Sequence, residues 1–289
     1  MTICYFSAQY LPTVGGVERY TWNLARCTVA AGHRAIVVTS ALPNLPEREI
    51  DGDGIEIYRL PVWPVMSGRF PIIKPGARFD ALTAQIWAQK LDFCVVQTRM
   101  YTQSVWAARA AKRRGVNVTC ETAPHYIAFS EEDVTDDGKF KMNPPIRSER
   151  DKAAILEAVK DGTIDMIATD HAPHSAEEKS KGFEDSLNGI IGLETAFAVM
   201  NTLLCETGEI PFEKLVQLMS TNPASRFNLD GGQLAEGGSA DIVIIDKNAE
   251  WVIDKEKFKS MGRSCPFDGM KVKGQVAATI CGGDIVYER

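Results

Sequence analysis

The 289-residue sequence lacks the features that mark several classes of protein. No apolar run is long enough to cross a membrane, and no basic segment followed by an apolar core marks a secretory signal at the N-terminus. The seven cysteines are scattered with no C-x-x-C pair, which is typical of reduced thiols in the cytoplasm. A net charge of −6 offers no basic excess for nucleic acid. The sequence therefore predicts a cytoplasmic globular protein that has no membrane span and does not bind nucleic acid.

Strand and helix patterns alternate through the first 115 residues. Apolar runs predict strands at residues 2–6, 34–39, 55–60 and 93–97. Helical patterns predict helices at residues 20–31, 77–90 and 103–114, and a glycine closes the first and the third. Such alternation is typical of a parallel α/β sheet with right-handed crossovers. Gly15 and Gly16 fall at the first strand-to-helix turn, where backbone amides can approach a phosphate, although a plain tight turn is the alternative.

A second βα pattern follows, and one of its strands ends in a polar motif. The apolar residues within 165–169 predict a buried strand, and Asp170-His171-Ala172-Pro173-His174 follows it directly. A carboxylate and two imidazoles at the C-terminal end of a parallel strand stand where such folds place their chemistry. The alternative is that Asp170 caps a turn and the two histidines are surface residues.

Further motifs surround this one in a characteristic order. They are E-T-A-P-H at 121–125, K-M-N-P-P-I-R at 141–147, G-I-I-G-L-E-T at 189–195 and T-N-P-A at 221–224. In this order and spacing, residues 116–289 resemble the C-terminal part of dihydroorotase, a zinc amidohydrolase of pyrimidine synthesis. The resemblance implies hydrolysis of a cyclic amide, with dihydroorotate as the small-molecule substrate and zinc as the cofactor.

The resemblance also implies roles for individual residues. Asp170 would bind the metal and shuttle a proton, which makes it both the catalytic and the metal-binding candidate. Asn143 and His174 would contact the pyrimidine ring, and the backbone at Gly189 would contact the substrate. The family usually has a proline near Asn188, where this sequence has none. His125 would have a supporting or packing role.

Most of the ligands that the resemblance implies for zinc are missing. The family supplies an H-x-H pair from the first barrel strand, and a carboxylated lysine or aspartate and two histidines from later strands. The four histidines here are His33, His125, His171 and His174, and none forms H-x-H. Only Asp170 of that set remains, and one carboxylate does not hold zinc against water. We therefore expect no hydrolysis by this chain alone, and whether it is an enzyme is open at this point.

The first 115 residues resemble a different family. V-G-G-V-E-R at 14–19, A-G-H-R-A-I-V-V-T-S at 31–40 and V-V-Q-T-R at 95–99 are similar to the N-terminal lobe of a family 4 glycosyltransferase of GT-B architecture. The resemblance implies that Gly15 and Gly16 face the phosphates of a nucleotide sugar. In that family the donor site lies mainly on a second lobe, which this sequence does not have, so sugar transfer is not expected.

The sequence is thus interpreted as a chimera of three parts. Residues 1–115 form a Rossmann-like lobe, 116–228 a partial amidohydrolase barrel and 229–289 a small β domain. Residues 107–116 fit either family, and no Gly/Ser/Pro linker separates the halves. We therefore predict an α/β fold in which a parallel Rossmann-like sheet continues through the junction into the last two βα units of a truncated barrel.

Three functions stay open. The chain is a dihydroorotase-like amidohydrolase with an incomplete site, a sugar-binding or nucleotide-sugar-binding lobe with an unrelated extension, or a chimera without catalysis. Natural fusion, engineered chimera and gene-model error are all open as its origin. Apolar surface left where missing strands would pack predicts self-association.

Overall fold

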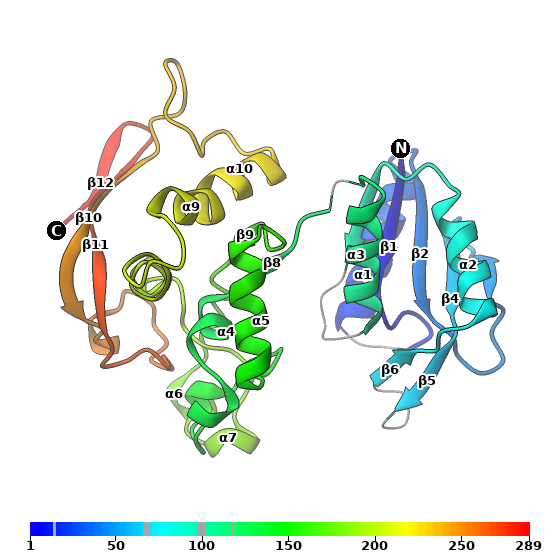
Figure 1. Ribbon diagram of the computed structural model, residues 1–289, viewed down its shortest axis with the longest axis horizontal. Helices are drawn as coiled ribbons and strands as arrows, with labels where there is room; N and C mark the ends of the chain where they lie inside the picture. The colour runs from blue at the N-terminus through cyan, green and yellow to red at the C-terminus, as the bar shows by residue number, and fades with distance from the viewer. Residues whose placement is uncertain (14–15, 66–69, 97–101, 117) are drawn as a thin grey trace. The chain divides into compact units, whose positions relative to one another are not determined.

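The computed structural model describes residues 1–13, 16–65, 70–96, 102–116 and 118–289. These residues divide into two compact units, Met1–Val118 and Thr119–Arg289, shown in Figure 1. In the described ranges no helix has the length and apolar character needed to cross a membrane.

The first unit is built on a five-stranded sheet in the order β3-β4-β2-β1-β7. Its strands are β1 (Thr2–Phe6), β2 (Arg34–Ser40), β3 (Arg48–Ile50), β4 (Glu56–Leu60) and β7 (Phe93–Val96). Its helices are α1 (Gly16–Ala30), α2 (Ala77–Trp87) and α3 (Thr102–Arg113). The four strands β4, β2, β1 and β7 run parallel, and β3 joins the edge antiparallel to β4. A separate antiparallel pair is formed by β5 (Val62–Val65) and β6 (Phe70–Ile73).

Helices cover both faces of this sheet because its strands are apolar on both sides. Alternate residues of a strand point to opposite faces. Phe6 of β1 packs in one core cluster with residues of α2 and α3, whereas its neighbour Tyr5 packs in another cluster beside α1. Continuous apolar runs such as Ile36-Val37-Val38, all fully buried, are therefore explained by burial on both faces. The predicted parallel α/β pattern is confirmed in this unit.

The second unit begins with short βα elements. They are β8 (Glu121–Thr122), α4 (Pro124–Ala128), η1 (Glu131–Asp133), η2 (Gly138–Phe140), α5 (Glu149–Lys160), β9 (Met166–Ile167), α6 (Ala176–Lys179) and α7 (Gly182–Asp185). β8 and β9 pair in parallel, and an isolated parallel bridge joins His171 to Ile190 beyond them. The Ser148 hydroxyl caps the start of α5 by accepting a hydrogen bond from the Asp151 amide at 3.3 Å.

Helices and an antiparallel sheet complete this unit. The helices are α8 (Ala196–Met200), its continuation η3 (Asn201–Cys205), α9 (Phe212–Val216), η4 (Gln217–Thr221), α10 (Asn222–Phe227) and η5 (Lys255–Lys257). The sheet is β10 (Ile242–Val252), β11 (Lys271–Cys281) and β12 (Asp284–Glu288) in the order β10-β11-β12. Buried Met200, Leu204 and Leu218 form the core with Phe267. Each such side chain contributes roughly 1.5–3 kcal/mol on burial.

The prediction of one sheet running through the junction is wrong for the described residues. β8 pairs with β9, and in the part of the chain that the structure describes no strand of the five-stranded sheet pairs with it. The cause is a set of long-range hydrogen bonds at Cys120. The Cys120 amide donates to the Asp165 carboxylate at 2.8 Å, and the Cys120 carbonyl accepts from the Asp165 and Met166 amides at 2.9 and 3.2 Å. The segment before β8 is therefore held by the segment before β9.

Candidate functional site

Asp170 follows β9 in a strained backbone conformation. Its φ is 48°, in the left-handed region that few residues other than glycine adopt, although aspartate tolerates it better than most. Its side chain is 47% exposed, and partial burial raises the pKa of its carboxyl above the usual range. Strained residues of this kind are concentrated at functional sites. The sequence motif and the backbone therefore both direct attention to this residue.

His125 is the nearest imidazole to the Asp170 carboxylate. Its Nε2 lies 3.7 Å from Asp170 Oδ2, which is too long for a hydrogen bond. The ring is 99% buried beside Tyr126, and burial lowers the pKa of His125 to about 4. At neutral pH the pair is therefore a carboxylate beside a neutral imidazole, with no ion pair between them.

Tyr126 connects this pair to the segment that carries Asn143. Its hydroxyl donates to the Pro144 carbonyl at 2.7 Å, next to the cis Asn143–Pro144 peptide bond. Burial, and then the Asp170 charge, raises the pKa of Tyr126, so the hydroxyl stays protonated and remains a donor. Asn143 itself is exposed, and its side-chain amide makes no hydrogen bond to any described residue. Asn143 was predicted to contact the pyrimidine ring, and its side-chain amide is free to do so.

The loop of residues 170–174 is locked against residues 188–193. The Ala172 amide donates to the Ile190 carbonyl at 2.9 Å. His171 Nδ1 accepts the backbone amides of Gly192 and Leu193 at 3.2 and 3.3 Å. Both bonds require Nδ1 to be unprotonated, so the neutral ring carries its proton on Nε2.

His174 is held by the same segment. Its Nε2 lies 2.9 Å from the Asn188 carbonyl, and because a carbonyl only accepts, Nε2 is the donor. Its Nδ1 lies 3.6 Å from the Glu178 carboxylate. The predicted ring contact through His174 is therefore open only at Nδ1, on the side of the ring where Glu178 lies.

Gly189 fits its position because it lacks a side chain. Its φ is 141°, and a Cβ there would lie 2.5 Å from the Ala172 carbonyl oxygen and 3.0 Å from the His174 ring. Its amide donates to the Lys141 carbonyl at 2.9 Å. The backbone groups expected to meet substrate here, the Gly189 amide and the Asn188 carbonyl, are thus already used within the protein. The structure does bring Asp170, His174, Gly189 and the segment of Asn143 together in one group of loops.

The donors present do not fit a zinc ion. Zinc in hydrolases takes at least three protein ligands. In the described ranges no group of three or more His, Cys, Asp or Glu side chains could hold a metal ion. His171 uses Nδ1 to accept backbone amides, His174 is open only at Nδ1, and His125 is buried at 3.7 Å from Asp170, so these side chains do not form a set of three ligands. These described side chains therefore do not supply the ligand set that zinc requires.

The predicted phosphate site falls in the first unit. Gly15 lies outside the described residues, and Gly16 is the first residue of α1. The part that can be described is thus a helix N-terminus that follows the first strand of the sheet.

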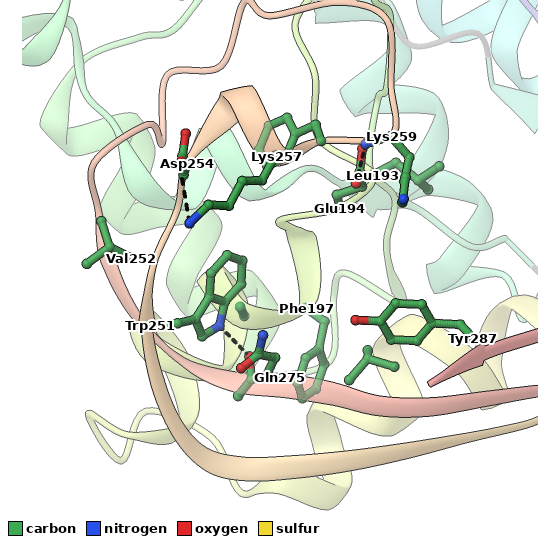
Figure 2. Close-up of a pocket in the computed structure, with 14 residues that line it drawn as sticks. Leu193, Glu194, Phe197, Trp251, Val252, Asp254, Lys257, Lys259, Gln275 and Tyr287 are labelled. Carbon is green, nitrogen blue, oxygen red and sulfur yellow. Dashed lines mark hydrogen bonds and ion pairs between the residues drawn. The ribbon is translucent and has the colours of Figure 1, made fainter. Parts of the chain in front are cut away.

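A cavity of about 700 Å³ lies between α8 and the sheet of β10–β12, and Leu193 is among its lining residues. Figure 2 shows aromatic side chains around it, among them Phe197, Trp251 and Tyr287. The Trp251 indole donates to the Gly274 carbonyl at 3.0 Å, and Lys257 pairs with Asp254 at 3.5 Å. None of the sequence-predicted site residues is among those that line it.

Comparison with known proteins gives a match for each of the two resemblances. The sequence matches the family described as "Amidohydrolase family" over residues 88–286. The chain belongs to the amidohydrolase family. A second match, described as "Glycosyl transferase 4-like domain", covers residues 15–157. Both resemblances seen in the sequence are thus found as matches. They overlap at residues 88–157, and the amidohydrolase match extends upstream of residue 116.

Curated relatives of this chain include dihydroorotases. This chain is 48% identical over 211 residues to a dihydroorotase of Brevibacillus brevis, which covers 72% of this chain and 49% of the relative. It is 46% identical over 211 residues to a dihydroorotase of Bacillus cereus, with 73% and 49% covered. The chain thus spans about half the length of the curated relatives it matches.

Solved structures of amidohydrolases share its fold. An L-hydantoinase (dihydropyrimidinase) from Arthrobacter aurescens is 25% identical with a TM-score of 0.66, over 99% of this chain and 64% of that one. A D-hydantoinase (dihydropyrimidinase) from Thermus sp. is 22% identical with a TM-score of 0.66, over 99% and 63%. The second likeness concerns the fold alone.

The sequence did not reveal how these loops are held. Tyr126 joins the His125 and Asn143 segments. The only feature of the sequence that pointed to it is its place directly after the Pro124-His125 pair. Lys179 gave no signal in sequence, yet it is a buried cation whose Nζ donates to the Lys141 and Leu187 carbonyls at 3.1 and 2.7 Å. It holds the carbonyl that also accepts from Gly189.

Proposed function

We propose that the second unit binds a cyclic amide of the dihydroorotate class at the loops after β9, and that its described residues do not hydrolyse that amide unaided. The observation that carries the proposal is the group of loops around Asp170. A half-exposed carboxylate in a strained conformation and the free amide of Asn143 lie on segments joined by hydrogen bonds through Tyr126, Lys141 and Gly189.

The chemistry of these groups suits such a ring. A cyclic amide presents N–H donors and carbonyl acceptors in one plane. The Asp170 carboxylate accepts hydrogen bonds, and the Asn143 amide both donates and accepts them. The names of the dihydroorotase relatives support the same class of substrate. The hydrogen-bonded loops reduce the entropy lost on binding, because they are ordered before the ligand arrives.

Hydrolysis requires more than these groups provide. Water must be activated to attack an amide carbonyl, and general-base catalysis by one side chain contributes only about 10²–10⁴-fold. His125 is neutral and buried, so it neither shares a charge with Asp170 nor reaches solvent. Asp170 is thus left as the one candidate base among these groups, without a second polarising group on the substrate.

Calorimetric titration of the full chain with dihydroorotate tests binding. We expect saturable binding that weakens about 3- to 10-fold in Asn143→Ala, the effect of one hydrogen bond. Asn248→Ala, at an exposed position on β10 of the same unit, serves as the matched control and should leave binding unchanged. No binding, or equal weakening by both substitutions, would refute the site.

A second candidate function belongs to the first unit. The parallel strands in the order β4-β2-β1-β7 follow the first four positions of a doubly wound nucleotide-binding sheet, and Gly16 begins the helix after β1. These observations favour a sugar-binding or nucleotide-sugar-binding lobe. Titration with a uridine diphosphate sugar tests it, and heat of binding that follows a single-site curve would support it.

A further inference from the structure

A small cavity on the second unit is lined by an excess of positive charge. Its volume is about 210 Å³, and its charged lining consists of four cations and two carboxylates. The cations are Lys139, Lys179, Lys255 and Arg263, and the carboxylates are Asp137 and Asp268. We call this the cationic cavity. It shares no lining residue with the loop of residues 170–174.

Both carboxylates are already engaged in holding the lysines. Asp137 accepts the Lys139 amide at 2.8 Å and lies 3.8 Å from its ammonium. Asp268 accepts the Lys255 amide at 3.1 Å and lies 3.3 Å from its ammonium. An ammonium has three N–H donors, so each lysine has donors left for a ligand.

Lys179 is a buried charge without a carboxylate partner. The residue is 7% exposed, and the two hydrogen bonds of its ammonium go to backbone carbonyls. Among the described residues Lys179 makes no ion pair within 4.0 Å, and the Asp137 charge acts on it from a longer distance. Burial, and then the charge of Lys141, lowers the pKa of Lys179 to about 8. A buried cation of this kind is costly unless it gains a counter-charge.

Two more donors line the same cavity. The Ser264 hydroxyl is buried and has no hydrogen-bond partner among the described residues. The Arg263 guanidinium donates through Nη1 to the carbonyls of Ser260 and Gly262 and lies 3.5 Å from Glu256, which leaves other N–H donors of its five. The thiol of Cys265 also lines the cavity, but burial raises the pKa of Cys265 to about 11, so it adds no negative charge.

We propose that the cationic cavity binds a small oxyanion, a phosphate or a carboxylate, between Lys179, Arg263 and the Ser264 hydroxyl. Such a ligand would satisfy the hydroxyl and supply the counter-charge that Lys179 lacks. Charge-assisted hydrogen bonds to oxyanions are about twice as strong as neutral ones. The proposal does not depend on any amidohydrolase activity, because Lys179, Arg263 and Ser264 are not among the residues proposed to contact the cyclic amide.

The site also has a route to the loops near Asp170. The Lys141 carbonyl accepts from both Lys179 Nζ and the Gly189 amide, and the Ser264 carbonyl accepts from the Ile191 amide at 2.9 Å. A bound oxyanion would therefore contact Ser264, whose carbonyl bonds to Ile191, and Lys179, which shares the Lys141 carbonyl with Gly189.

The test is calorimetric titration of the full chain with inorganic phosphate and, separately, malonate. Both titrations use constant ionic strength set with chloride, so that general screening is the same throughout. We expect one saturable site per chain for at least one of the two anions. Binding of phosphate alone identifies a phosphate site, binding of malonate alone a carboxylate site, and binding of neither overturns the proposal.

Variants separate this site from general surface charge. Arg263→Gln and Ser264→Ala should each weaken binding, Arg263→Gln by about tenfold, the effect of one charged hydrogen bond. Lys257→Gln is the matched control, because its side chain is 83% exposed and lies on neighbouring η5 outside the cationic cavity. Circular dichroism checks that each variant is folded. Equal weakening by all three variants, or by none, would overturn the assignment.

Nuclear magnetic resonance of the lysine side chains gives a second readout. The bound anion should raise the pKa of Lys179 from its lowered value, whereas the Lys257 signal should not move. An unchanged Lys179 titration at saturating anion would contradict the geometry even if some anion binds elsewhere.

Discussion

Burial of His125 makes a direct prediction about proton binding and stability. The ring is 99% buried, its Nε2 has no hydrogen-bond partner among the described residues, and its pKa falls to about 4. An ordinary histidine has a pKa of about 6.5. Asp170 acts in the opposite direction, since a carboxylate favours imidazolium. Its Oδ2 is 3.7 Å away on a side chain that is 47% exposed, so solvent weakens its effect.

The sign of the effect on stability follows from linkage. Between pH 4 and pH 6.5 the unfolded chain binds a proton at His125 that the folded chain does not, so folding becomes less favourable as the pH falls through this range. A difference of about 2.5 pKa units corresponds to about 3 kcal/mol at most. The folded state therefore has its full stability with respect to His125 above pH 6.5. This stability is lost progressively as the pH falls towards 4.

Titration of the four histidines by nuclear magnetic resonance measures this pKa. His125→Gln assigns the signal, and the same variant should flatten the fall in stability of the second unit between pH 6.5 and 4.5. His33→Gln removes an imidazole from the first unit and should leave the second unit's pH dependence as it is. A His125 signal that titrates near 6.5, or an unchanged acid-side slope in His125→Gln, would refute the reasoning.

Three further outcomes follow from the second unit. Gly189→Ala should cost about 1–3 kcal/mol in chemical denaturation because its Cβ would meet the Ala172 carbonyl, whereas Gly208→Ala, also at positive φ but in open space, should cost less. Equal losses would show that contact with the loop is irrelevant. The purified chain should not hydrolyse dihydroorotate with or without added zinc, and turnover that disappears in Asp170→Ala would contradict this. The exposed apolar residues Ile285 and Val286 on β12 should cause self-association on a sizing column that Ile285→Lys reduces; a monomer at high concentration would contradict it.

The strands of the first unit could be predicted because burial on both faces produces continuous apolar runs. Residues 2–6 were predicted without error, and residues 34–39 with one residue missing at the end. β3 and the β5–β6 pair were not predicted. β3 has three residues, none of them buried, so it has no apolar run to detect. Its pairing with β4 is a property of the edge of the sheet and not of its own composition.

The junction was predicted wrongly because strand pairing there is set at long range. The local sequence at β8 (Glu121–Thr122) does not identify the neighbour of that strand. Asp165, 45 residues along the chain from Cys120, provides the side-chain and backbone bonds that decide the pairing. Such a partner leaves no local pattern, and so the continuous sheet was a reasonable but incorrect inference.

The sequence motifs indicated candidate site residues but not the contacts of those residues. The motif placed Asp170 and His174 on one loop, and the structure has them there. The motif could not indicate that Asn188 takes one nitrogen of His174, or that His171 accepts two backbone amides. These bonds depend on how residues 188–193 pack against the loop, which is a tertiary property.

The two units provide a last prediction, because each has a core of its own. The clusters around Phe6 and Tyr5 lie within Met1–Val118, and the clusters around Met200 and Phe140 lie within Thr119–Arg289. Separate cores favour separate unfolding transitions. Leu204 in the second unit is 1% exposed, so Leu204→Ala should cost about 2–5 kcal/mol there and lower the melting temperature of that unit by roughly 2–4 °C per kcal/mol.

Tryptophan fluorescence can follow the units separately. Four of the five tryptophans lie in the first unit, and Trp251 is the fifth, in the second. Fluorescence should therefore report mainly the first unit, while far-ultraviolet circular dichroism reports both. We expect fluorescence and circular dichroism to give different midpoints in the wild type. Leu204→Ala should shift only the transition of the second unit, to which fluorescence responds weakly. Coincident midpoints that move together in Leu204→Ala would show instead that the halves of this amidohydrolase-family chain fold as one cooperative unit.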